Sequence, residues 1–477
     1  MLRSILFVYT PAFAQTAVYM LQSVEYRPGV HLKWLWQVND FNKVAYRRNL
    51  VKTRPAKMLL WAFLLGELVE AAIAIWLFVS GVTAPHYGYI PIAVGLFLIT
   101  PLLWAHLIIL PLWLGDWIII KPSQGRKISR AKTSFAKHPA VKIAIAGSYG
   151  KTTMKEILLT VLGDVKNVAA TPANKNVSIS HALFAERLNG DEDILIIEYG
   201  EGAPGDVARF AQRTRPTVGV ITGLAPAHLD RYKTLKAAGE DIFSLADYLG
   251  GKEVYVSGDS PDTRKFLKKG YEVFSAEGID GWKVSGVKTT VDGLEFNLSN
   301  GSKKLRIKSH LLGRHQVGPL ALAAYLADKF GLNARQIESG IAKIKPFEHR
   351  MQPYQLGGAW IIDDTYNGNI EGMKAGLELL KELPAKRKMY VTPGLVDQGA
   401  EEKSIHIELG QAIKAAEPDQ VVLMKHSVTA YIEEGLTGYK GQLVIEEDPL
   451  NFYTNLDKLV AAGDLVLLQN DWPDQYN

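Results

Sequence analysis

The chain has 477 residues, enough for about three domains at roughly 150 residues each. It contains no cysteine, which excludes disulfides, thiol nucleophiles, iron–sulfur clusters and cysteine-ligated zinc. The formal net charge of +5 is small for this length, so the composition does not indicate a nucleic-acid-binding protein. Most long apolar runs lie in residues 1–120, and the rest has the pattern of an α/β protein.

Three apolar stretches near the N-terminus are candidate membrane helices. Residues 58–80 are long enough to cross a bilayer, which requires about 20 apolar residues of helix. Residues 89–120 are the second candidate, because prolines are tolerated in membrane helices and Trp113 and Trp117 suit the membrane interface. Residues 5–21 are shorter, so this stretch either spans the membrane or lies in its interface. We therefore predict two to three transmembrane helices.

The distribution of basic residues predicts the orientation of these helices. Lysine and arginine concentrate in residues 27–57, the predicted loop between the first two apolar stretches, and in residues 121–132, whereas the short loop of residues 81–88 contains neither. By the positive-inside rule, both basic stretches and everything after the second are cytoplasmic. Glu67 and Glu70 lie on one helix face, and we expect them to pair helices or lie at the interface rather than form a site. Buried helices of a soluble domain are the alternative.

A glycine-rich turn follows the apolar strand pattern of residues 141–146. It reads Gly147-Ser148-Tyr149-Gly150-Lys151-Thr152-Thr153 and leads into a helical pattern at residues 154–162. In such a turn, backbone N–H groups and the helix N-terminus face nucleotide phosphates, the lysine reaches the β/γ oxygens, and the next hydroxyl ligates Mg²⁺. Ile145 stands where the general pattern has its first glycine, and a chance glycine turn is the alternative. The residues that we predict to bind the nucleotide are Gly147, Ser148, Gly150, Lys151, Thr152 and Thr153.

This version of the loop, G-x-x-G-K-T-T after an apolar strand, resembles that of the Mur ligases and folylpolyglutamate synthetases. Three later segments are similar to Mur ligase motifs and occur in the same order. They are Thr171-Pro172-Ala173-Asn174-Lys175-Asn176, Glu198-Tyr199-Gly200 and Ala227-His228-Leu229-Asp230. The resemblance implies substrate contacts for Thr171, Asn174 and Asn176. It also implies that Thr152, Glu198 and His228 hold Mg²⁺, although Glu198 and His228 taken singly would more often be structural.

The second half of the chain contains further motifs that resemble this family. Gly313-Arg314-His315-Gln316 resembles the segment near the adenine, with Gln316 in place of an asparagine, and Arg350 fits an arginine that the C-terminal domain brings to the nucleotide. Asp363-Asp364-Thr365-Tyr366-Asn367-Gly368-Asn369 is similar to a motif of the MurF-like ligases, which add D-alanyl-D-alanine to a muramoyl peptide. By itself, this segment would indicate an Asx-rich turn. The resemblance implies nucleotide contacts for Gln316, Arg350 and Asp364, and substrate contacts for Tyr366, Asn367 and Asn369.

The resemblance implies an ATP-dependent ligase that joins a carboxylic acid to an amine. The acid would take the γ-phosphate of ATP to form an acyl phosphate, which the amine would then attack. Charge stabilisation of the migrating phosphoryl group makes Lys151, Glu198, His228 and Arg350 the predicted catalytic residues. Because Arg350 and Asp364 belong to another predicted domain, we expect the site to be complete only after domain closure.

The sequence departs from the family pattern in two places. Matching Glu240 to a family glutamate puts Ala238 where many relatives carry a carbamylated lysine, and we hypothesise that Glu240 or Asp241 supplies the missing negative charge. Apolar segments also stand in place of the soluble domain that grips the UDP part of the substrate. Either UDP is held elsewhere, or the acceptor is lipid-linked or otherwise presented at the membrane.

These inferences give one predicted architecture. The fold is α/β, with N-terminal transmembrane helices, a central domain with a phosphate loop of Mur ligase type and a C-terminal Rossmann-like domain. The predicted boundaries are a membrane anchor at residues 1–122, a central ATPase domain at 123–344 and a C-terminal domain at 345–477. Residues 273–310 alternate between apolar and polar and contain turns, which predicts a small β insertion. Residues 389–392, 420–423 and 465–468 have the pattern of strands and alternate with helical stretches, which predicts a mostly parallel sheet in the C-terminal domain.

The predicted function is a MurF-like addition of an amino acid or dipeptide to a cell-wall precursor, either a small molecule or lipid-linked, with ATP and Mg²⁺ as cofactors. We expect the chain to lie in a bacterial cytoplasmic membrane and to contact lipids but no nucleic acid, and the sequence does not predict its oligomeric state. One alternative is another membrane-bound ligase of Mur type, such as a poly-γ-glutamate synthase. The other is an inactive nucleotide-binding membrane scaffold, against which the retention of Lys151, Thr152, Glu198 and His228 argues.

Overall fold

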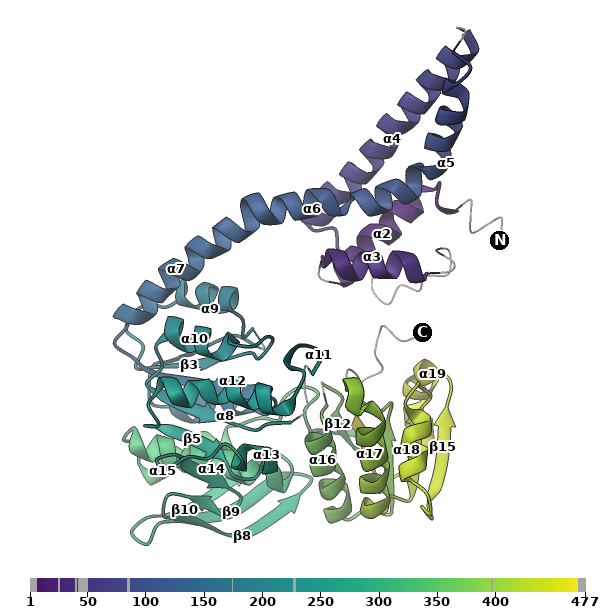
Figure 1. Cartoon of the computed structure of the whole chain (residues 1–477). Helices are drawn as coiled ribbons and strands as arrows, with labels where there is room; N and C mark the ends of the chain where they lie inside the picture. Colours follow the sequence, from purple (N-terminus) through teal and green to yellow (C-terminus); the bar gives the residue numbers. More distant parts are fainter. Residues whose placement is uncertain are drawn as a thin grey trace. The chain divides into compact units, whose positions relative to one another are not determined.

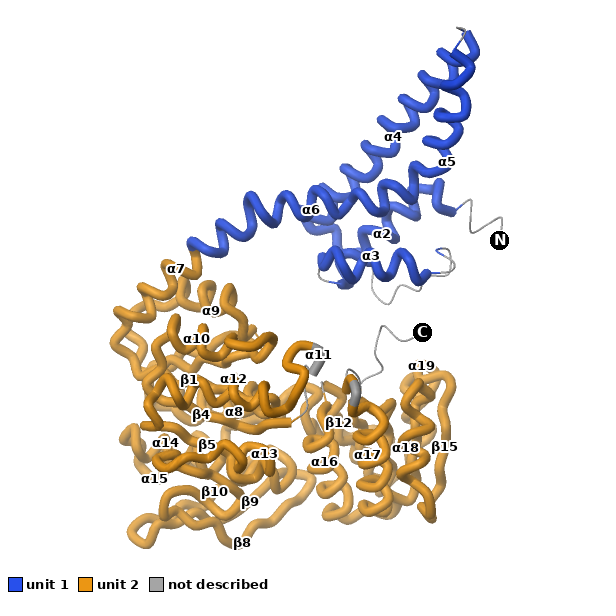
Figure 2. The backbone as a smooth tube through the Cα atoms, viewed as in Figure 1, with its two compact units in different colours: residues 1–126 blue, residues 127–477 orange. Residues whose placement is uncertain are grey.

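The computed structural model describes residues 7–24, 26–38, 41, 50–83, 86–173, 175–225, 229–366, 368–395 and 398–470. The chain divides into two compact units, residues 1–126 and residues 127–477 (Figure 2). The second unit contains two separate β-sheets, and the predicted boundary at residue 344 falls between them in sequence. The division of this unit into two domains stays a prediction.

The first unit is helical over most of the residues that the structure describes. Its elements are α2 (Pro11–Ser23), α3 (Pro28–Gln37), α4 (Arg54–Thr83), α5 (Tyr89–Leu107), α6 (Ile109–Gly115) and the π-helical turn η2 (Asp116–Ile120), which leads into α7 (Lys121–Lys137) (Figure 1). The basic stretch 27–57 was predicted as a loop, but it contains α3. This helix begins at Pro28, whose fixed φ and missing N–H suit the first turn of a helix.

Two helical stretches, Arg54–Thr83 and Tyr89–Lys137, are long and apolar enough to cross a membrane, by length and composition alone. By contrast, α2 has 13 residues, and at 1.5 Å per residue it is about 20 Å long, less than the roughly 30 Å of a hydrocarbon core. Its residues Phe13 and Leu21 are buried in one cluster with Phe63. Two alternatives were predicted for residues 5–21, and this helix fits the one in which the stretch does not span the membrane.

A buried carboxylate and close packing hold α4 against α5. A Cβ atom at Gly66 would lie 2.4 Å from the ring of Trp104, so only glycine leaves room for this ring. The indole Nε1–H of Trp104 donates to Glu70 Oε2 at 2.7 Å. Glu70 is 8% exposed and pairs the two helices, as predicted.

The first sheet of the second unit has ten strands in the order β10-β9-β8-β7-β6-β5-β4-β1-β3-β2. Strands β1 to β6 run parallel and β7 to β10 form the antiparallel insertion expected at residues 273–310. Because β1 lies between β3 and β4, the strand order reverses at its carboxyl end, where sheets of this kind bind ligands. The strands are β1 (Val141–Ala146), β2 (Val168–Ala170), β3 (Ile194–Glu198), β4 (Val218–Ile221), β5 (Val254–Ser257), β6 (Glu272–Ser275), β7 (Gly278–Ile279), β8 (Trp282–Thr290), β9 (Gly293–Ser299) and β10 (Lys304–Ser309).

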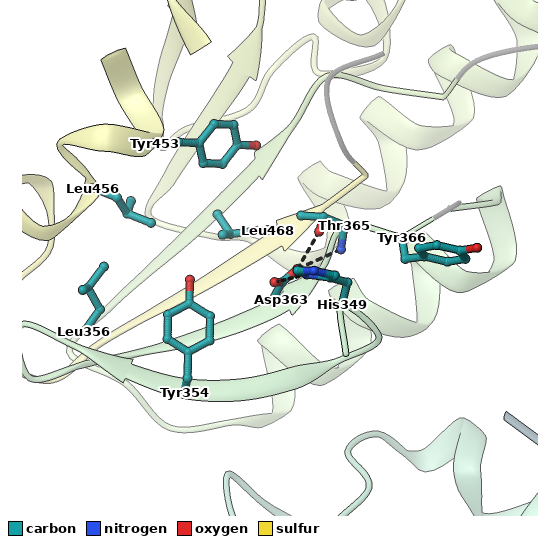
Figure 3. Close-up of a pocket in the computed structure, with 9 residues that line it drawn as sticks. All are labelled: His349, Tyr354, Leu356, Asp363, Thr365, Tyr366, Tyr453, Leu456 and Leu468. Carbon is teal, nitrogen blue, oxygen red and sulfur yellow. Dashed lines mark hydrogen bonds and ion pairs between the residues drawn. The ribbon is translucent and has the colours of Figure 1, made fainter. Parts of the chain in front are cut away.

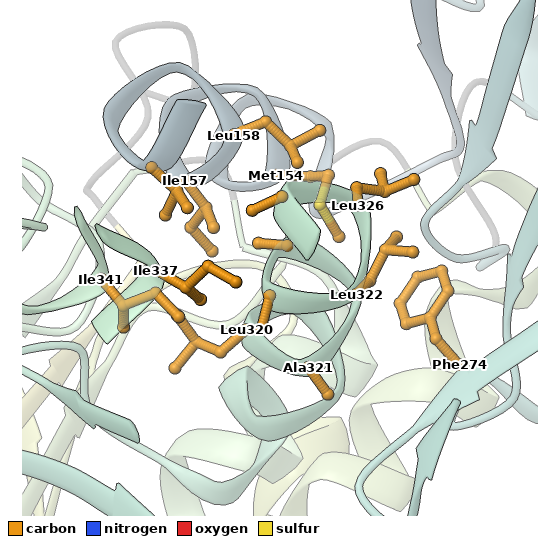
Figure 4. Packing of buried hydrophobic residues seen from close by; sticks show 14 of the residues in the cluster. Met154, Ile157, Leu158, Phe274, Leu320, Ala321, Leu322, Leu326, Ile337 and Ile341 are labelled. Atoms are coloured by element: carbon orange, nitrogen blue, oxygen red, sulfur yellow. The ribbon is translucent and has the colours of Figure 1, made fainter. Parts of the chain in front are cut away.

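Alternate side chains of β1 enter two different cores. Ile143 and Ile145 pack with α8, α14 and α15, whereas Ala144 and Ala146 pack with α9, α10 and α12, as the two-residue period of a strand requires. Figure 4 shows the first core, where Leu158 faces side chains of α14 and α15. The helices are α8 (Lys151–Gly163), α9 (Ser178–Ala185), α10 (Asp206–Thr214), α11 (Leu229–Tyr232), α12 (Leu235–Tyr248), α13 (Pro261–Arg264), the 3-10 turn η3 (Arg314–Gln316), α14 (Val317–Lys329) and α15 (Ala334–Ala342).

The second sheet has six strands in the order β11-β12-β16-β13-β14-β15. All neighbours are parallel except β11, which is antiparallel to β12. Strands predicted at residues 389–392, 420–423 and 465–468 are confirmed as β13, β14 and β16. The elements are β11 (Gln352–Leu356), β12 (Ala359–Asp364), α16 (Ile370–Glu382), β13 (Arg387–Thr392), η4 (Gly399–Glu401), α17 (Glu402–Ala416), β14 (Gln420–Met424), α18 (Thr429–Gly435), β15 (Gln442–Glu446), α19 (Pro449–Thr454), α20 (Leu456–Leu459) and β16 (Asp464–Gln469).

Candidate nucleotide and ligase site

The phosphate loop connects β1 to α8, so the predicted strand, turn and helix are all present. Gly147 and Gly150 have φ angles of 145° and 77°, which side chains rarely allow. A Cβ atom on Gly147 would also lie 2.4 Å from Thr222 Oγ1. Lys151 and Thr152 are the first two residues of α8. Their position puts unpaired backbone N–H groups and the positive end of the helix dipole at the loop, which favours phosphate binding.

The amine of Lys151 is paired with a carboxylate that sequence reasoning missed. Its Nζ lies 2.6 Å from Glu201 Oε2, and both side chains are largely buried. The amine also donates to the carbonyl oxygen of Gly147. Glu201 stands three residues after Glu198 in the loop that follows β3, which is the one sequence signal that could have indicated it.

Glu198 lies at the carboxyl end of β3 and gathers three polar side chains. Its Oε1 accepts from Thr152 Oγ1 at 3.1 Å and from Asn176 Nδ2 at 3.2 Å. Its Oε2 lies 3.3 Å from Nζ of Lys155, a fully buried lysine that the sequence analysis did not single out. A hydroxyl and a carboxylate at this separation are the oxygen ligands that Mg²⁺ prefers, so Thr152 and Glu198 fit their predicted role as metal ligands.

The predicted substrate segment after β2 contributes in two ways. Asn176 lines the cleft beside Glu198. Thr171 is buried, and its hydroxyl accepts a hydrogen bond from the backbone N–H of Glu198 at 3.0 Å, so it holds the backbone that carries the Glu198 carboxylate. Thr171 is not among the residues that line the cleft. Three predicted site residues lie outside the described residues, namely Asn174, His228 and Asn367.

An arginine just before β11 and a carboxylate at the end of β12 also line the cleft. The guanidinium of Arg350 lies over the ring of Tyr366, with 4.6 Å between the guanidinium carbon and the ring centroid. Asp364, at the end of β12, accepts from Gln469 Nε2 at 2.8 Å and from the backbone N–H of Met351 at 3.2 Å. Burial raises the pKa of Asp364 to about 6, against the lowering effect of these two hydrogen bonds.

Asn369 caps the N-terminus of α16. Its side chain accepts the backbone N–H of Gly372 at 3.0 Å, which satisfies one donor of the first helical turn. The side chain also lines the cleft, so a substrate contact would come from its amide nitrogen or from a shared oxygen.

Gln316 and His315, which the family resemblance puts near the adenine, both line the cleft. Gln316 Nε2 and His315 Nε2 are 2.8 Å apart. Among the described residues, Gln316 Oε1 and His315 Nδ1 are buried without a hydrogen-bond partner. Burial lowers the pKa of His315 to about 4, so its ring is neutral near pH 7. A neutral ring nitrogen and an amide oxygen can form hydrogen bonds with the donors and acceptors of a nucleobase.

These groups share one cleft of about 900 Å³, lined from both sheets of the second unit. Apolar side chains such as Phe274 and Leu311 line it together with the polar groups. Gly147 and Thr171 are described but do not line this cleft. The predicted site residues that line it are Ser148, Gly150, Lys151, Thr152, Thr153, Asn176, Glu198, Gln316, Arg350, Asp364, Tyr366 and Asn369.

The structure argues against the hypothesis that α12 supplies a negative charge to the site. The side chain of Glu240 is 61% exposed and lies 3.8 Å from Lys236 on the same helix. Asp241 is buried and accepts from the hydroxyl of Tyr232 at 2.7 Å and from the N–H of Gly205 at 2.9 Å, so its oxygens hold neighbouring loops. Neither carboxylate lines the cleft. The sequence could not reveal this, because the direction in which a helix turns each carboxylate depends on its packing.

Asp363 faces away from the cleft into a separate pocket of about 490 Å³ (Figure 3). It neighbours Asp364 on β12, and successive strand residues point to opposite faces. Its carboxylate accepts from Thr365 Oγ1 at 2.7 Å and lies 2.7 Å from His349 Nδ1. Asp363, the first aspartate of the Asp-Asp motif, therefore holds the loop that follows β12, and Asp364, the second, faces the cleft.

Comparisons with known proteins agree with this arrangement. Residues 145–327 match the Mur ligase middle domain, and residues 349–469 match the Mur ligase, glutamate ligase domain. The chain is 30% identical over 297 residues to the UDP-N-acetylmuramoyl-tripeptide--D-alanyl-D-alanine ligase of Escherichia coli (strain K12), which covers 60% of this chain and 64% of that protein. A protein of the same name from Synechocystis sp. is 29% identical over 333 residues, covering 69% of this chain and 71% of that one.

Solved structures share the fold. MurF from Acinetobacter baumannii has a TM-score of 0.65 at 19% identity, covering 73% of this chain and 77% of that chain. MurF ligase from Thermotoga maritima, solved in complex with ADP, has a TM-score of 0.63 at 22% identity, covering 73% and 80%. The chain spans just under two thirds of the length of its Escherichia coli relative, and residues 1–144 lie outside both domain matches. The two domain matches, with the shared fold and the phosphate-loop cleft, show that the chain belongs to the Mur ligase family.

Proposed function

We propose that this chain is an ATP-dependent ligase that forms a carbon–nitrogen bond in the manner of MurF. The observation that carries the proposal is a single cleft that is lined by Lys151 and Thr152 of α8, by Glu198 at the end of β3, and by Arg350 and Asp364 beside the second sheet. The relatives are named for a UDP-N-acetylmuramoyl-tripeptide and D-alanyl-D-alanine. We propose the same chemistry for this chain: a peptide-bearing cell-wall precursor as the acid and D-alanyl-D-alanine, or a related amino acid or dipeptide, as the amine.

In the first step, a carboxylate oxygen of the acceptor attacks the γ-phosphorus of ATP. The bond from this phosphorus to the bridging oxygen breaks, and ADP leaves with the electron pair. Lys151 holds the β/γ oxygens from the N-terminus of α8, and Arg350 approaches from the segment before β11, so positive charge meets the transferred group from two elements. Mg²⁺ held by Thr152 and Glu198 would add charge stabilisation to the same oxygens.

In the second step, the amine nitrogen attacks the acyl carbon of the acyl phosphate. The carbon–oxygen bond to the phosphate breaks, inorganic phosphate leaves, and the nitrogen loses a proton as the amide forms. In both steps the protein mainly positions reactants and excludes water, which a cleft lined by two sheets does when they close on the substrates.

A phosphate-release assay on the detergent-solubilised full chain tests this function. We expect release that requires Mg-ATP, an acceptor and an amine together, and at least a 10²-fold loss in Lys151→Ala, since its charge acts on the transferred phosphoryl group. Lys236→Ala is the matched control, because this lysine is exposed on α12. UDP-linked and lipid-linked muramoyl peptides should be compared as acceptors, and D-alanyl-D-alanine, glutamate and other amino acids as amines.

The pattern of substrates decides between the alternatives. Release that requires glutamate and no muramoyl peptide would favour a poly-γ-glutamate synthase. Binding of Mg-ATP without release for any pair would favour an inactive scaffold. Equal turnover by Lys151→Ala and the parent would overturn the proposal altogether.

We also propose that α4 and α5 hold the chain in the cytoplasmic membrane of a bacterium, with the second unit in the cytoplasm. Two features support this location: the length and apolar composition of the two helical stretches, and the basic residues on both sides of the pair. The absence of cysteine allows a clean test with single-cysteine variants. A membrane-impermeant maleimide should label Tyr87→Cys, between the two helices, in intact cells and Lys236→Cys only after lysis. The reverse pattern would contradict the orientation.

A further inference from the structure

Helix α5 is long enough by itself to cross a hydrocarbon core, so the apolar helix that follows it needs a separate explanation. With 19 residues at 1.5 Å each, α5 is about 28 Å long, close to the roughly 30 Å of such a core. Residues 89–120, which the sequence predicted as one span, would be about 48 Å long as a straight helix. If α5 crosses the core, α6 and η2 therefore extend beyond it.

The chain bends where α5 ends. Helix α5 ends at Leu107, and Pro111 lies in the first turn of α6. A proline has no N–H to donate to the carbonyl oxygen four residues before it, here that of Leu107, and its ring clashes with that carbonyl group. Figure 1 shows that α6 turns away from the direction of α5. The apolar helix thus leaves the axis of the span.

The surface of α6 and η2 is apolar on several sides. Residues 109–120 are all described, and none of them is buried. The three consecutive residues Ile118, Ile119 and Ile120 are each about half exposed or more, although successive residues of a helix point in different directions. A medium that surrounds the helix would cover such a surface better than one flat protein face. The large apolar side chains that are 48% to 67% exposed are Leu110, Trp113, Leu114, Trp117, Ile118, Ile119 and Ile120.

The neighbours of α6 and η2 have the composition of a membrane interface. Helix α3 packs against α6 and presents Trp36, which is 74% exposed. The indole N–H of Trp36 donates to His106 Nε2 at 3.0 Å. Tryptophan favours the interface because it combines an apolar ring with a polar N–H. Lys121 pairs with Asp116 at 2.8 Å, and Arg126 is exposed one turn further on, so charged groups lie beside the apolar ones.

We propose that α6 and η2 lie flat in the interface of the cytoplasmic leaflet, as a third membrane contact that does not span. Their apolar side chains enter the upper acyl region, and Lys121 and Arg126 meet anionic headgroups. The partner is therefore a bilayer that contains anionic lipid. The proposal rests on the membrane location proposed above for α4 and α5. A second copy of the chain is the competing occupant, but it would cover one side of η2 only.

Spin labels on single cysteines measure the depth of α6 and η2. The full chain has no cysteine of its own, so Leu110→Cys, Leu114→Cys and Ile118→Cys each carry one label. These sites lie four residues apart and share one side of a helix. In vesicles of phosphatidylcholine and phosphatidylglycerol, the depth follows from the relative access of oxygen and a water-soluble nickel complex to the label. We expect similar depths, about 5–10 Å below the headgroups, at all three sites.

Two further labels calibrate the measurement. Ile73→Cys lies halfway between Gly66 and Gly81, the two positions where α4 closely contacts α5, and should be the deepest label. Lys236→Cys, whose side chain is 81% exposed on α12, should report water. Because three labels probe α6 and η2 independently, the test still decides if one variant does not fold.

Three results would overturn the proposal. A steady change in depth of about 12 Å from residue 110 to residue 118 would mean that the span continues through α6. Nickel access equal to that of Lys236→Cys at all three sites would mean that water surrounds this helix. Spin–spin broadening at Ile118→Cys that disappears on dilution with unlabelled chain would mean that a second copy covers η2. Nickel access at Ile73→Cys would instead contradict the membrane location of α4.

Discussion

Leu320 on α14 is fully buried between helices, whereas Leu68 on α4 is 67% exposed, although both are leucines in regular helices of one chain. The same contrast holds more widely. Among the described residues, the second unit encloses most of its large apolar side chains in four buried clusters, whereas the first unit exposes many of its own on α4, α5 and η2. The mean hydropathy of 0.00 averages these two parts and describes neither. The contrast supports the proposal that α4 and α5 lie in a membrane, because apolar side chains that point outward from a helix suit an apolar medium.

Matched truncations of the two leucines should give very different losses of stability. Leu320→Ala leaves a cavity among packed side chains and should lower the free energy of unfolding of the second unit by about 2–5 kcal/mol. Leu68→Ala removes the same atoms from an exposed side chain and should change it by less than about 0.5 kcal/mol. Pulse proteolysis in urea, following fragments of residues 127–477, measures both. Equal losses would mean that the contrast in exposure does not reflect packing.

A charge on the exposed face of α4 should weaken the association of the first unit with the membrane. Leu68 lies near the middle of α4, so Leu68→Arg should disfavour membrane insertion by about 3 kcal/mol. Leu443→Arg is the control, because Leu443 is a partly exposed leucine on β15 of the second unit. The measurement is the fraction of chain that stays in membranes after carbonate extraction. Full retention of Leu68→Arg together with full activity would argue that α4 does not lie in lipid.

The stability of the second unit should depend on pH, because the ionised form of the buried Asp364 is unfavourable. Its folded pKa of about 6 lies above the unfolded value near 4, so its protonated form favours folding. The stability that it contributes is therefore fully present below pH 4 and is lost as the pH rises through 6. The difference in unfolding free energy between the parent and Asp364→Asn should change by about 2–3 kcal/mol over this range. A constant difference from pH 4 to 7 would contradict the raised pKa.

The smallest expected effect concerns a helix cap. Asn333 forms a capping box with Gln336 at the start of α15 in the second unit, whereas α2 and α3 of the first unit, like α8 of the second, have no side-chain cap. Asn333→Ala should cost about 1 kcal/mol in urea unfolding of the second unit. Gln336→Ala removes only the reciprocal hydrogen bond and should cost less. A larger loss in Gln336→Ala would show that the cap is not the cause.

The sequence predicted local features well, because their signals are local. The apolar strand, the two glycines and Lys151 are contiguous, so the loop between β1 and α8 could be predicted. The parallel strands of the second sheet were predicted from short apolar runs for the same reason. Helix α3 was missed, since a basic and tryptophan-rich stretch after a proline has no clear apolar period.

Features that depend on distant residues could not be predicted. Glu201 lies 50 residues from Lys151, and only the folded sheet brings their side chains together. The hypothesis about α12 failed for the same reason, because Tyr232 and Gly205 decide where Asp241 points. The predicted roles of His228, Asn174 and Asn367 stay predictions, since these residues lie outside the described part of the chain.

Strand β16 comes last in its sheet along the chain, yet it lies between β12 and β13. Its end, Gln469 and Asn470, donates to Asp364 and the carbonyl oxygen of Gly394 and accepts the N–H of Gly368. While the ribosome still holds residues 464–470, the nascent sheet is split into β11–β12 and β13–β14–β15, with no pairing between the pieces. Biosynthesis therefore assembles the phosphate loop early and the carboxylate that faces it only once β16 is released, so a translational pause before β16 would leave two unpaired strand edges open to misfolding.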